Sequence, residues 1–198
     1  MKKIEKQSLP LSQLFHHVVW TITPRPVYII GTRNEDGTAN FSTITCVSNT
    51  PGPPEHIIIS TAAKRTIANI QRTGEFSVNL CNGEMAVLAD YVGSVSGEDG
   101  VKDAMPYGFV WGEKAEVPVL DASPCVFECK LSEEHQVHIG AFHTFFGEVV
   151  NLHIDVELNP PTDSREAAFN WFQSIDIHGI NPLVYHSLLK YFRVGEKM

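Results

Sequence analysis

Short apolar runs alternate with turn-forming residues along most of the chain. The runs at 27–32 and 38–47 flank an Asp-Gly pair at 36 and 37, and such a pair between two alternating runs predicts a β-hairpin. The same alternation predicts strands at the following positions: 56–61, 75–80, 124–131, 143–158 and a closing pair within 182–187 and 190–194. The pattern therefore indicates a mainly β protein.

Helical spacing is confined to short segments. Ile67 and Ile70 are placed to share one face of a helix, and Gly74 follows where that helix would end. We also expect a short helix at 85–91 and another at 164–174, which opens with a serine suited to cap it. Few, short helices beside many short strands favour a β-barrel or sandwich over a doubly wound sheet.

The length of 198 residues suits one domain, and we expect that domain to span 1–198. Residues 93–108 are rich in Gly, Ser and Asp and predict a long loop, which in most proteins is functional or mobile. No GxGxxG motif follows a predicted strand. A nicotinamide cofactor, if used, is therefore not held by a Rossmann unit.

The formal net charge is -8, from 23 acidic residues against 15 Lys and Arg. This balance argues against a nucleic-acid partner, because phosphate backbones demand clustered cations. Glu5 and Pro10 interrupt the basic N-terminal run, and no apolar core of a signal peptide follows it. No other run approaches the roughly 20 apolar residues of a membrane span. We therefore expect a cytoplasmic protein with no membrane partner.

The four cysteines, Cys46, Cys81, Cys125 and Cys129, form no CxxC pair. Scattered cysteines in a cytoplasmic chain are usually reduced thiols in the core. Cys125 and Cys129 share a predicted strand, where a four-residue step separates them by roughly 13 Å. That distance is too long for a disulfide or a shared metal ion, so we expect buried thiols.

Histidines near the predicted strand at 143–158 raise two questions. A zinc site of His135, His138 and His143 is disfavoured, because residues three apart on a strand point to opposite faces. In 143–158 the apolar residues fall on even positions. This alternation places His143 on the outer face, free to meet a ligand, unless Gly147 forms a bulge. It places His153 in solvent.

A small basic window offers a candidate anion site. Lys64, Arg65 and Thr66 open the predicted helix two residues after the strand that ends at Ser60 and Thr61. On charge alone, a solvated turn explains these cations. The order of strand, connector and helix favours an anion site, because the first N–H groups of a helix lack partners. A phosphate suits this spacing, since Arg can grip two of its oxygens.

Taken together, these motifs resemble the flavin reductase and flavoredoxin family. PRPVYIIGTRNEDGTANFSTITCV, the prolines at 53 and 54, and KRTIANIQRTGEFSVNL are similar to its N-terminal half. LADYVGSVSGED resembles its middle segment, HTFFGEVVNLHID its histidine-containing strand, and NPLVYHSLLKYFRVGE its C-terminal close. The resemblance covers roughly residues 20 to 196 in family order, which is more specific than any single motif.

The resemblance implies an FMN-binding split β-barrel of Greek-key topology, and a homodimer with flavin near the subunit interface. It also implies a set of flavin contacts. Those beside the isoalloxazine are Asn40, Ser42, Thr43, Ile44, Thr45 and Cys46; Lys64, Arg65 and Thr66 would hold the phosphate, with Ser60 and Thr61 as further cofactor contacts; and Lys102, His143 and an aromatic, Tyr191 or Phe192, would lie near the flavin.

The function implied by the resemblance is an FMN oxidoreductase in which NADH or NADPH passes hydride to flavin, which then reduces an acceptor. His143 would orient the nicotinamide or the flavin edge. The alternatives are a flavoredoxin-type electron carrier that serves a protein partner, and a barrel that binds another phosphate-bearing cofactor or none. Two positions depart from the family pattern: Cys46 replaces a common Trp, and Ala-Phe-His at 141–143 replaces Gly-Asp-His.

Overall fold

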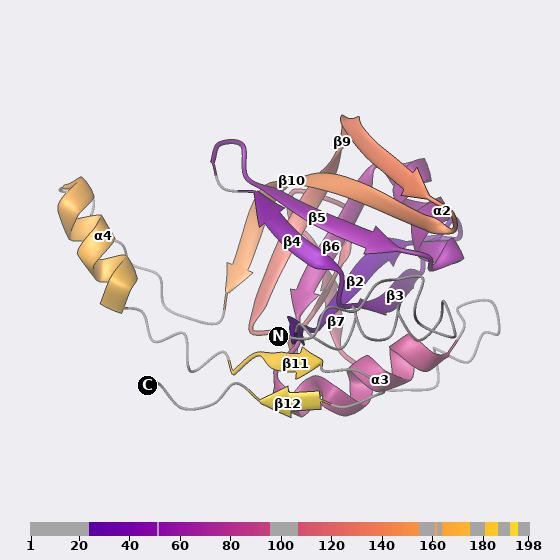
Figure 1. Cartoon of the computed structure of the whole chain (residues 1–198), viewed down its shortest axis with the longest axis horizontal. Helices are drawn as coiled ribbons and strands as arrows, with labels where there is room; N and C mark the ends of the chain where they lie inside the picture. Colours follow the sequence, from indigo (N-terminus) through magenta and orange to yellow (C-terminus); the bar gives the residue numbers. More distant parts are fainter. Residues whose placement is uncertain are drawn as a thin grey trace, which may run out of the picture.

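The body of the protein is a seven-stranded antiparallel sheet that curls into a half-barrel (Figure 1). The computed structural model describes residues 24–50, 52–95, 107–154, 161, 164–174, 181–185 and 191–193. The strand order is β3-β2-β6-β9-β10-β5-β4. The bounds are β2 (Tyr28–Arg33), β3 (Ala39–Ile44), β4 (Val47–Thr50), β5 (His56–Thr61), β6 (Glu75–Leu80), β9 (Cys125–Ile139) and β10 (Phe142–Ile154). The mainly β architecture expected from the sequence is confirmed.

Smaller elements surround this sheet. Two further sheets join β1 (Arg25–Pro26), β11 (Leu183–Tyr185) and β12 (Tyr191–Arg193), and β7 (Phe109–Trp111) with β8 (Pro118–Leu120). The helices are α2 (Lys64–Thr73), α3 (Ala86–Ser94) and α4 (Arg165–Ser174), with a 3-10 turn η2 (Gly83–Met85) before α3. Within the described ranges, no helix has the length and hydrophobicity that crossing a bilayer requires.

Two apolar clusters pack on the two faces of the sheet. Ile30, with Phe76 and Phe145, belongs to the cluster inside the barrel. Its neighbour Ile29 belongs to the other cluster, which includes Phe41 and residues of α3. Consecutive strand residues point to opposite faces, so β2 is buried on both sides and α3 covers the outer one.

The predicted hairpin and first helix are both confirmed. Asp36 accepts hydrogen bonds from the Thr38 N–H and hydroxyl, which lower the pKa of the Asp36 carboxyl. Helix α2 ends at Gly74, whose left-handed backbone (φ 69°) lets its N–H bond to the Ile70 carbonyl at 2.8 Å. Ser164 caps α4 by accepting from the Ala167 N–H at 3.0 Å.

The strand expected at 38–47 is wrong at its C-terminal end. It stops at Ile44, and Thr45 and Cys46 connect β3 to β4 without belonging to either. Ile44 pairs with β2, whereas Val47 pairs with β5. These pairs lie at opposite edges of the sheet, so the two connecting residues cross the split in the barrel. That crossing forms one side of the candidate site.

The expected orientation of β10 is also wrong in its first half. Register shifts lie between Phe145 and Gly147 and between Val149 and Asn151. Phe145 and Gly147 are both buried, so only the second shift changes which positions of β10 face inward. Before it the odd positions face the core, and Phe145 is 1% exposed. His143 therefore shares the face of Phe145 and does not point outward. Beyond the shift, His153 contacts Glu128 at 2.5 Å, so it is not a solvated residue.

Candidate functional site

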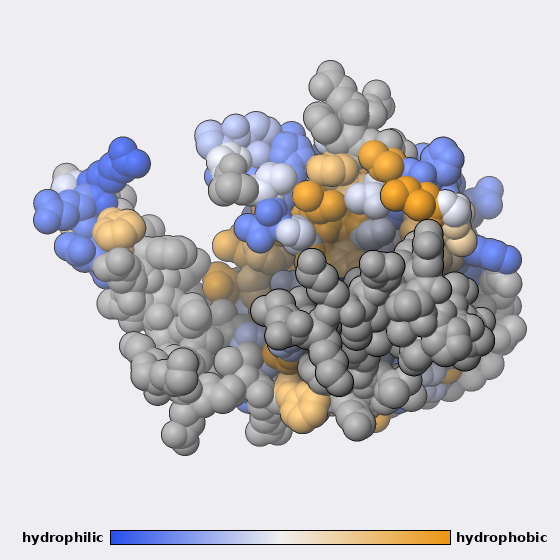
Figure 2. Space-filling model, viewed as in Figure 1, coloured by the Kyte–Doolittle hydropathy of each residue, from blue (hydrophilic) through white to orange (hydrophobic). Residues whose placement is uncertain are grey.

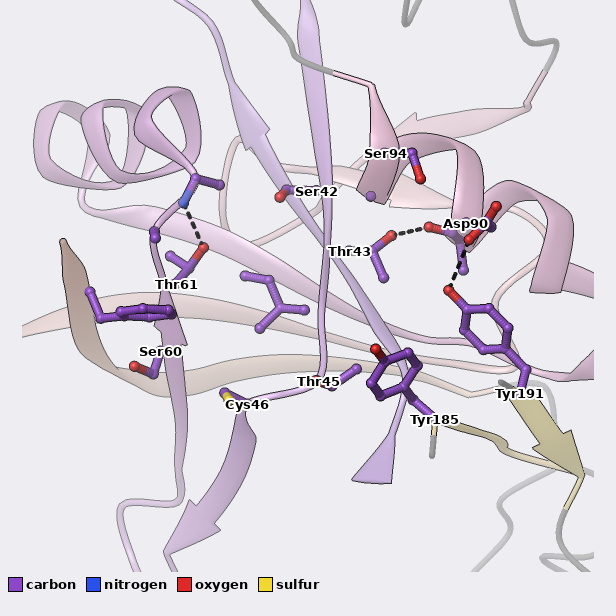
Figure 3. A pocket seen from close by; sticks show the side chains of 16 residues that line it. Ser42, Thr43, Thr45, Cys46, Ser60, Thr61, Asp90, Ser94, Tyr185 and Tyr191 are labelled. Carbon is purple, nitrogen blue, oxygen red and sulfur yellow. Dashed lines mark hydrogen bonds between the residues drawn. The ribbon is translucent and has the colours of Figure 1, made fainter. Parts of the chain in front are cut away.

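A pocket of about 360 Å³ lies at the split between the two edges of the sheet (Figure 3). It takes residues from β3 and the crossing after it, from the end of β5, from α3, from the start of β10 and from the strand pair β11–β12. The lining residues are Ser42, Thr43, Ile44, Thr45, Cys46, Ser60, Thr61, Ala62, Ala63, Ala89, Asp90, Gly93, Ser94, Phe142, Tyr185 and Tyr191. Serine and threonine hydroxyls make up much of its polar surface.

Helix α3 forms one wall and is fixed tightly to β3. The Thr43 hydroxyl donates to the Ala89 carbonyl at 2.5 Å. A side chain at Gly93 would put a Cβ 3.1 Å from the Thr43 Cβ, so only glycine permits this approach without displacing its neighbour. The wall therefore has little freedom to move relative to the strand.

The start of α2 forms the opposite corner. Thr61 accepts from the Ala63 N–H at 3.1 Å, which turns the chain from β5 into the helix. Ala63 has no side-chain group to bond the free N–H groups of the first turn, and that turn contains no acid. Lys64 and Arg65 are exposed beside it. An uncapped helix start with two cations is a favourable place for an anion.

Asn40 and Thr66 lie behind this corner and do not line the pocket. Asn40 donates to the Thr66 hydroxyl at 3.3 Å and to the Thr32 hydroxyl at 3.0 Å. Thr66 is 1% exposed. Asn69 donates to the same Thr32 hydroxyl and to Asn34. This buried network attaches the first turns of α2 to the β2–β3 hairpin, so these two predicted contacts position the helix start.

His143 is next to the pocket but does not line it. It pairs with Thr61 across β5 and β10. Its ring stacks between those of His138 and Phe145, at centroid distances of 5.7 and 6.1 Å. The adjacent Phe142 lines the pocket in its place. Among the residues that the structure describes, no group of three potential metal ligands comes together.

Two tyrosines close the far end. Tyr185 and Tyr191 face each other across β11 and β12 with ring centroids 5.6 Å apart. The Tyr191 hydroxyl donates to Asp90 on α3 over a long 3.3 Å. Burial and the Asp90 charge raise the pKa of Tyr191 to about 12, so the hydroxyl keeps its proton at neutral pH. Phe192 is 53% exposed and stands outside the pocket lining.

Cys46 lies at the crossing between β3 and β4 and lines the pocket. It is half-buried and free, whereas the other three cysteines are free and buried, as expected. Burial raises the pKa of the Cys46 thiol, and the charge of Arg25 opposes that effect. Cys46 is therefore a neutral thiol near pH 7. Lys102 falls outside the described residues.

The sequence missed the α3 wall and the first tyrosine. Ala89, Asp90, Gly93 and Ser94 line the pocket from one face of the helix. Their spacing of three and four residues is the available signal, because such positions share a helix face. A helix face of small residues with one acid does not by itself predict a ligand site. Tyr185 had no signal beyond its place in a predicted strand.

A second hollow, of about 650 Å³, lies elsewhere on the barrel. Its lining includes Tyr28, Val47, Phe127, Val149 and Leu152 and is mainly apolar. It contains no helix start. The smaller pocket is the better candidate for a phosphate-bearing ligand, because it adjoins the uncapped start of α2 and offers many hydroxyls.

Comparisons with known proteins agree with the fold. Flavoredoxin of Desulfovibrio vulgaris is 25% identical, with 88% of this chain and 89% of that chain covered and a TM-score of 0.72. A putative flavin reductase with a split barrel domain from Shewanella frigidimarina has a TM-score of 0.78 at 19% identity, covering 97% and 92% of the two chains. The expected split barrel is thereby confirmed.

Sequence comparisons point the same way. An uncharacterized protein of Methanothermobacter thermautotrophicus is 28% identical over 174 residues, which are 83% of this chain and 75% of that protein. The family profile described as "Flavin reductase like domain" matches residues 20–188. This match takes in both sheet edges, α2, α3 and β11. The chain therefore belongs to the family of flavin reductase like domains.

Proposed function

We propose that this protein is an FMN-binding oxidoreductase that uses NADH or NADPH to reduce flavin and passes the electrons to an acceptor. One observation carries the proposal: an uncapped helix start with two cations opens onto a hydroxyl-lined pocket that ends in two tyrosines. The volume of about 360 Å³ is within the range of cofactor and small-ligand sites. The donor set suits a ligand with a phosphate at one end and an aromatic ring at the other.

The phosphate belongs at the start of α2. Lys64 and Arg65 supply positive charge there, and the first-turn N–H groups supply directed donors. Thr61 keeps its hydroxyl engaged with the Ala63 N–H, so its part is to hold the connector in shape. Arg65 can grip two phosphate oxygens at once.

The ring belongs between the sheet edge at Ser42 to Cys46 and the tyrosine wall. FMN bound there would supply the redox chemistry, which belongs to the cofactor. The chain's own contribution is to bind the ring, orient it and exclude water from one face. Tyr185 and Tyr191 offer aromatic surface for this purpose. His143, one residue beyond Phe142 at the pocket's edge, would orient the donor through its position beside Thr61.

The visible spectrum of the protein as purified, and then of the protein with added FMN, tests the proposal first. A flavin band that stays with the protein through gel filtration is expected. Steady oxidation of NADH or NADPH by the FMN-loaded protein is the second expectation. A colourless protein whose thermal midpoint does not change with FMN would refute flavin binding altogether.

A second function, electron transfer to a protein partner without a nicotinamide reaction, is favoured by one comparison. The Desulfovibrio protein with 25% identity over most of both chains is a flavoredoxin. The two proposals give different results. A yellow protein that oxidises neither NADH nor NADPH would support the electron carrier and exclude the reductase.

A further inference from the structure

Asp90 is the one side chain with a formal charge among the described residues that line the pocket. It lies on α3 and is half-buried. Figure 3 shows it on the side of Tyr191 and Ser94, across the pocket from Thr61 and the start of α2. The neighbouring cations Lys64 and Arg65 are therefore at the opposite corner. The pocket has a positive end and a negative end.

The position of this carboxylate is fixed by its surroundings. Helix α3 is attached to β3 by the Thr43 hydroxyl and by close packing at Gly93. The Tyr191 hydroxyl donates to one carboxylate oxygen, Oδ1. The high pKa of Tyr191 keeps that hydroxyl a donor. Asp90 thus presents a carboxylate at a set place in the ring end of the pocket.

A fixed carboxylate distinguishes ligands by charge. An anionic ring substituent near Asp90 meets like-charge repulsion, which is strong in a partly water-excluded site. A carboxamide near Asp90 is attracted instead, because its N–H groups can donate a hydrogen bond to a carboxylate oxygen.

We propose that Asp90 is a specificity-determining residue, which makes the site beside the bound flavin, at the ring end of this pocket, accept neutral, amide-bearing rings and reject anionic ones. The inference rests on the proposed function, in that the ring selected is the donor or acceptor that meets the flavin. Among electron acceptors it favours neutral aromatic compounds over aromatic carboxylates.

The test uses nicotinamide and nicotinate, two ring probes that differ in a carboxamide against a carboxylate. Each is titrated into the FMN-loaded protein, and dissociation constants are taken from the change in flavin absorption. The wild-type protein is expected to bind nicotinamide at least about tenfold more tightly, as repulsion between partly buried like charges requires. Raising the ionic strength from about 0.05 M to about 0.5 M should narrow this ratio, because salt screens the repulsion.

Three variants isolate the charge. Asp90→Asn keeps an oxygen for the Tyr191 hydroxyl and removes the charge, so the ratio should fall toward one. Tyr191→Phe removes the hydroxyl that helps to fix the carboxylate but keeps the charge, so nicotinamide should still bind more tightly than nicotinate. Glu84→Gln removes an equal charge from an exposed residue outside the pocket lining and should leave both constants unchanged.

Equal wild-type affinities for the two probes, or an unchanged ratio in Asp90→Asn protein that still binds FMN, would overturn the inference. A wild-type protein that fails to bind FMN refutes the proposed function separately. In that case the role of Asp90 is tested on the flavin-free protein, by the shift that each probe causes in its thermal midpoint. A larger shift with nicotinamide, lost in Asp90→Asn, supports the role of Asp90; identical shifts contradict it.

Discussion

Arg65 is the residue on which the phosphate assignment depends most. Its side chain is exposed beside the uncapped start of α2 and next to the buried Thr66. We expect Arg65→Ala to weaken FMN binding by about 1 to 3 kcal/mol, the scale of a lost charge-assisted hydrogen bond. Fluorescence titration of FMN measures the change. Arg72→Ala is the matched control, because it removes the same charge from the last turn of the same helix.

Among the individual residues, the sequence predicted part of the candidate site. Strand end, connector and helix start are adjacent in the chain, so local order was enough to find Lys64 and Arg65. Asp90 and Tyr185 reach the pocket only through the packing of α3 and β11, which no local pattern reveals. Asn40 was placed at the ring by resemblance, but its amide is used to hold Thr66. If Arg65→Ala protein bound FMN as tightly as wild type, the assignment of Lys64 and Arg65 to the phosphate, which rested on local sequence order, would be wrong as well.

Among the elements, the β7–β8 hairpin shows most clearly what the sequence did not predict. It is held by Glu128 of β9, whose carboxylate accepts from the N–H groups of Glu113, Lys114 and Ala115 at 2.7 to 3.0 Å. His153 and Asn151 of β10 bond the same carboxylate. The hairpin is stabilised by a buried acid from a distant strand. Its own apolar runs are only three residues long, so the local sequence did not predict these two strands.

The folding stability that the Glu128 carboxylate contributes should depend on pH. Burial raises the pKa of Glu128, but the hydrogen bonds from His153, Glu113 and the others outweigh it and lower the pKa from 4.5 to about 2. A lowered folded-state pKa gives stability that is present above the unfolded value and is lost as the pH falls toward about 2. The shift corresponds to roughly 3 kcal/mol at neutral pH.

Glu128→Gln should therefore destabilise the protein at pH 7 by about 2 to 4 kcal/mol in urea unfolding, since it leaves several buried donors poorly paired. The difference between the two proteins should shrink as the pH falls from 4.5 toward 2. Glu113→Gln is the control, because only the backbone of Glu113 contacts the carboxylate. A difference that stayed constant with pH would mean that the Glu128 charge contributes nothing.

For the whole molecule, the alternating pattern predicted a mainly β barrel or sandwich, the family resemblance specified the split barrel, and neither predicted its surfaces. Most strands of the main sheet followed from local sequence, whereas the orientation of β10 depended on a register shift at Val150 that only the pairing with β9 determines. The end of the β9–β10 hairpin carries exposed apolar side chains. Val137 and Ile139 are 53% and 78% exposed there, and Phe142 is 39% exposed beside the pocket. Figure 2 shows hydrophobic side chains gathered over this part of the face.

We propose that a second copy of the chain covers this hairpin end, which would place the pocket near a subunit interface. Exposed apolar clusters of this kind mark interaction sites more often than chance.

Light scattering after gel filtration should give about 44 kDa, twice the chain mass of 22.0 kDa. Ile139→Lys should give the single-chain mass, because a charge cannot be buried unpaired in an apolar interface. Val110→Lys alters an equally apolar residue, 54% exposed on β7, and should remain dimeric. If wild type and Ile139→Lys have the same mass, the hairpin end is not the contact. Loss of FMN affinity in a monomeric Ile139→Lys protein would show that the partner helps to complete the pocket, whereas unchanged affinity would mean that one chain holds the flavin alone.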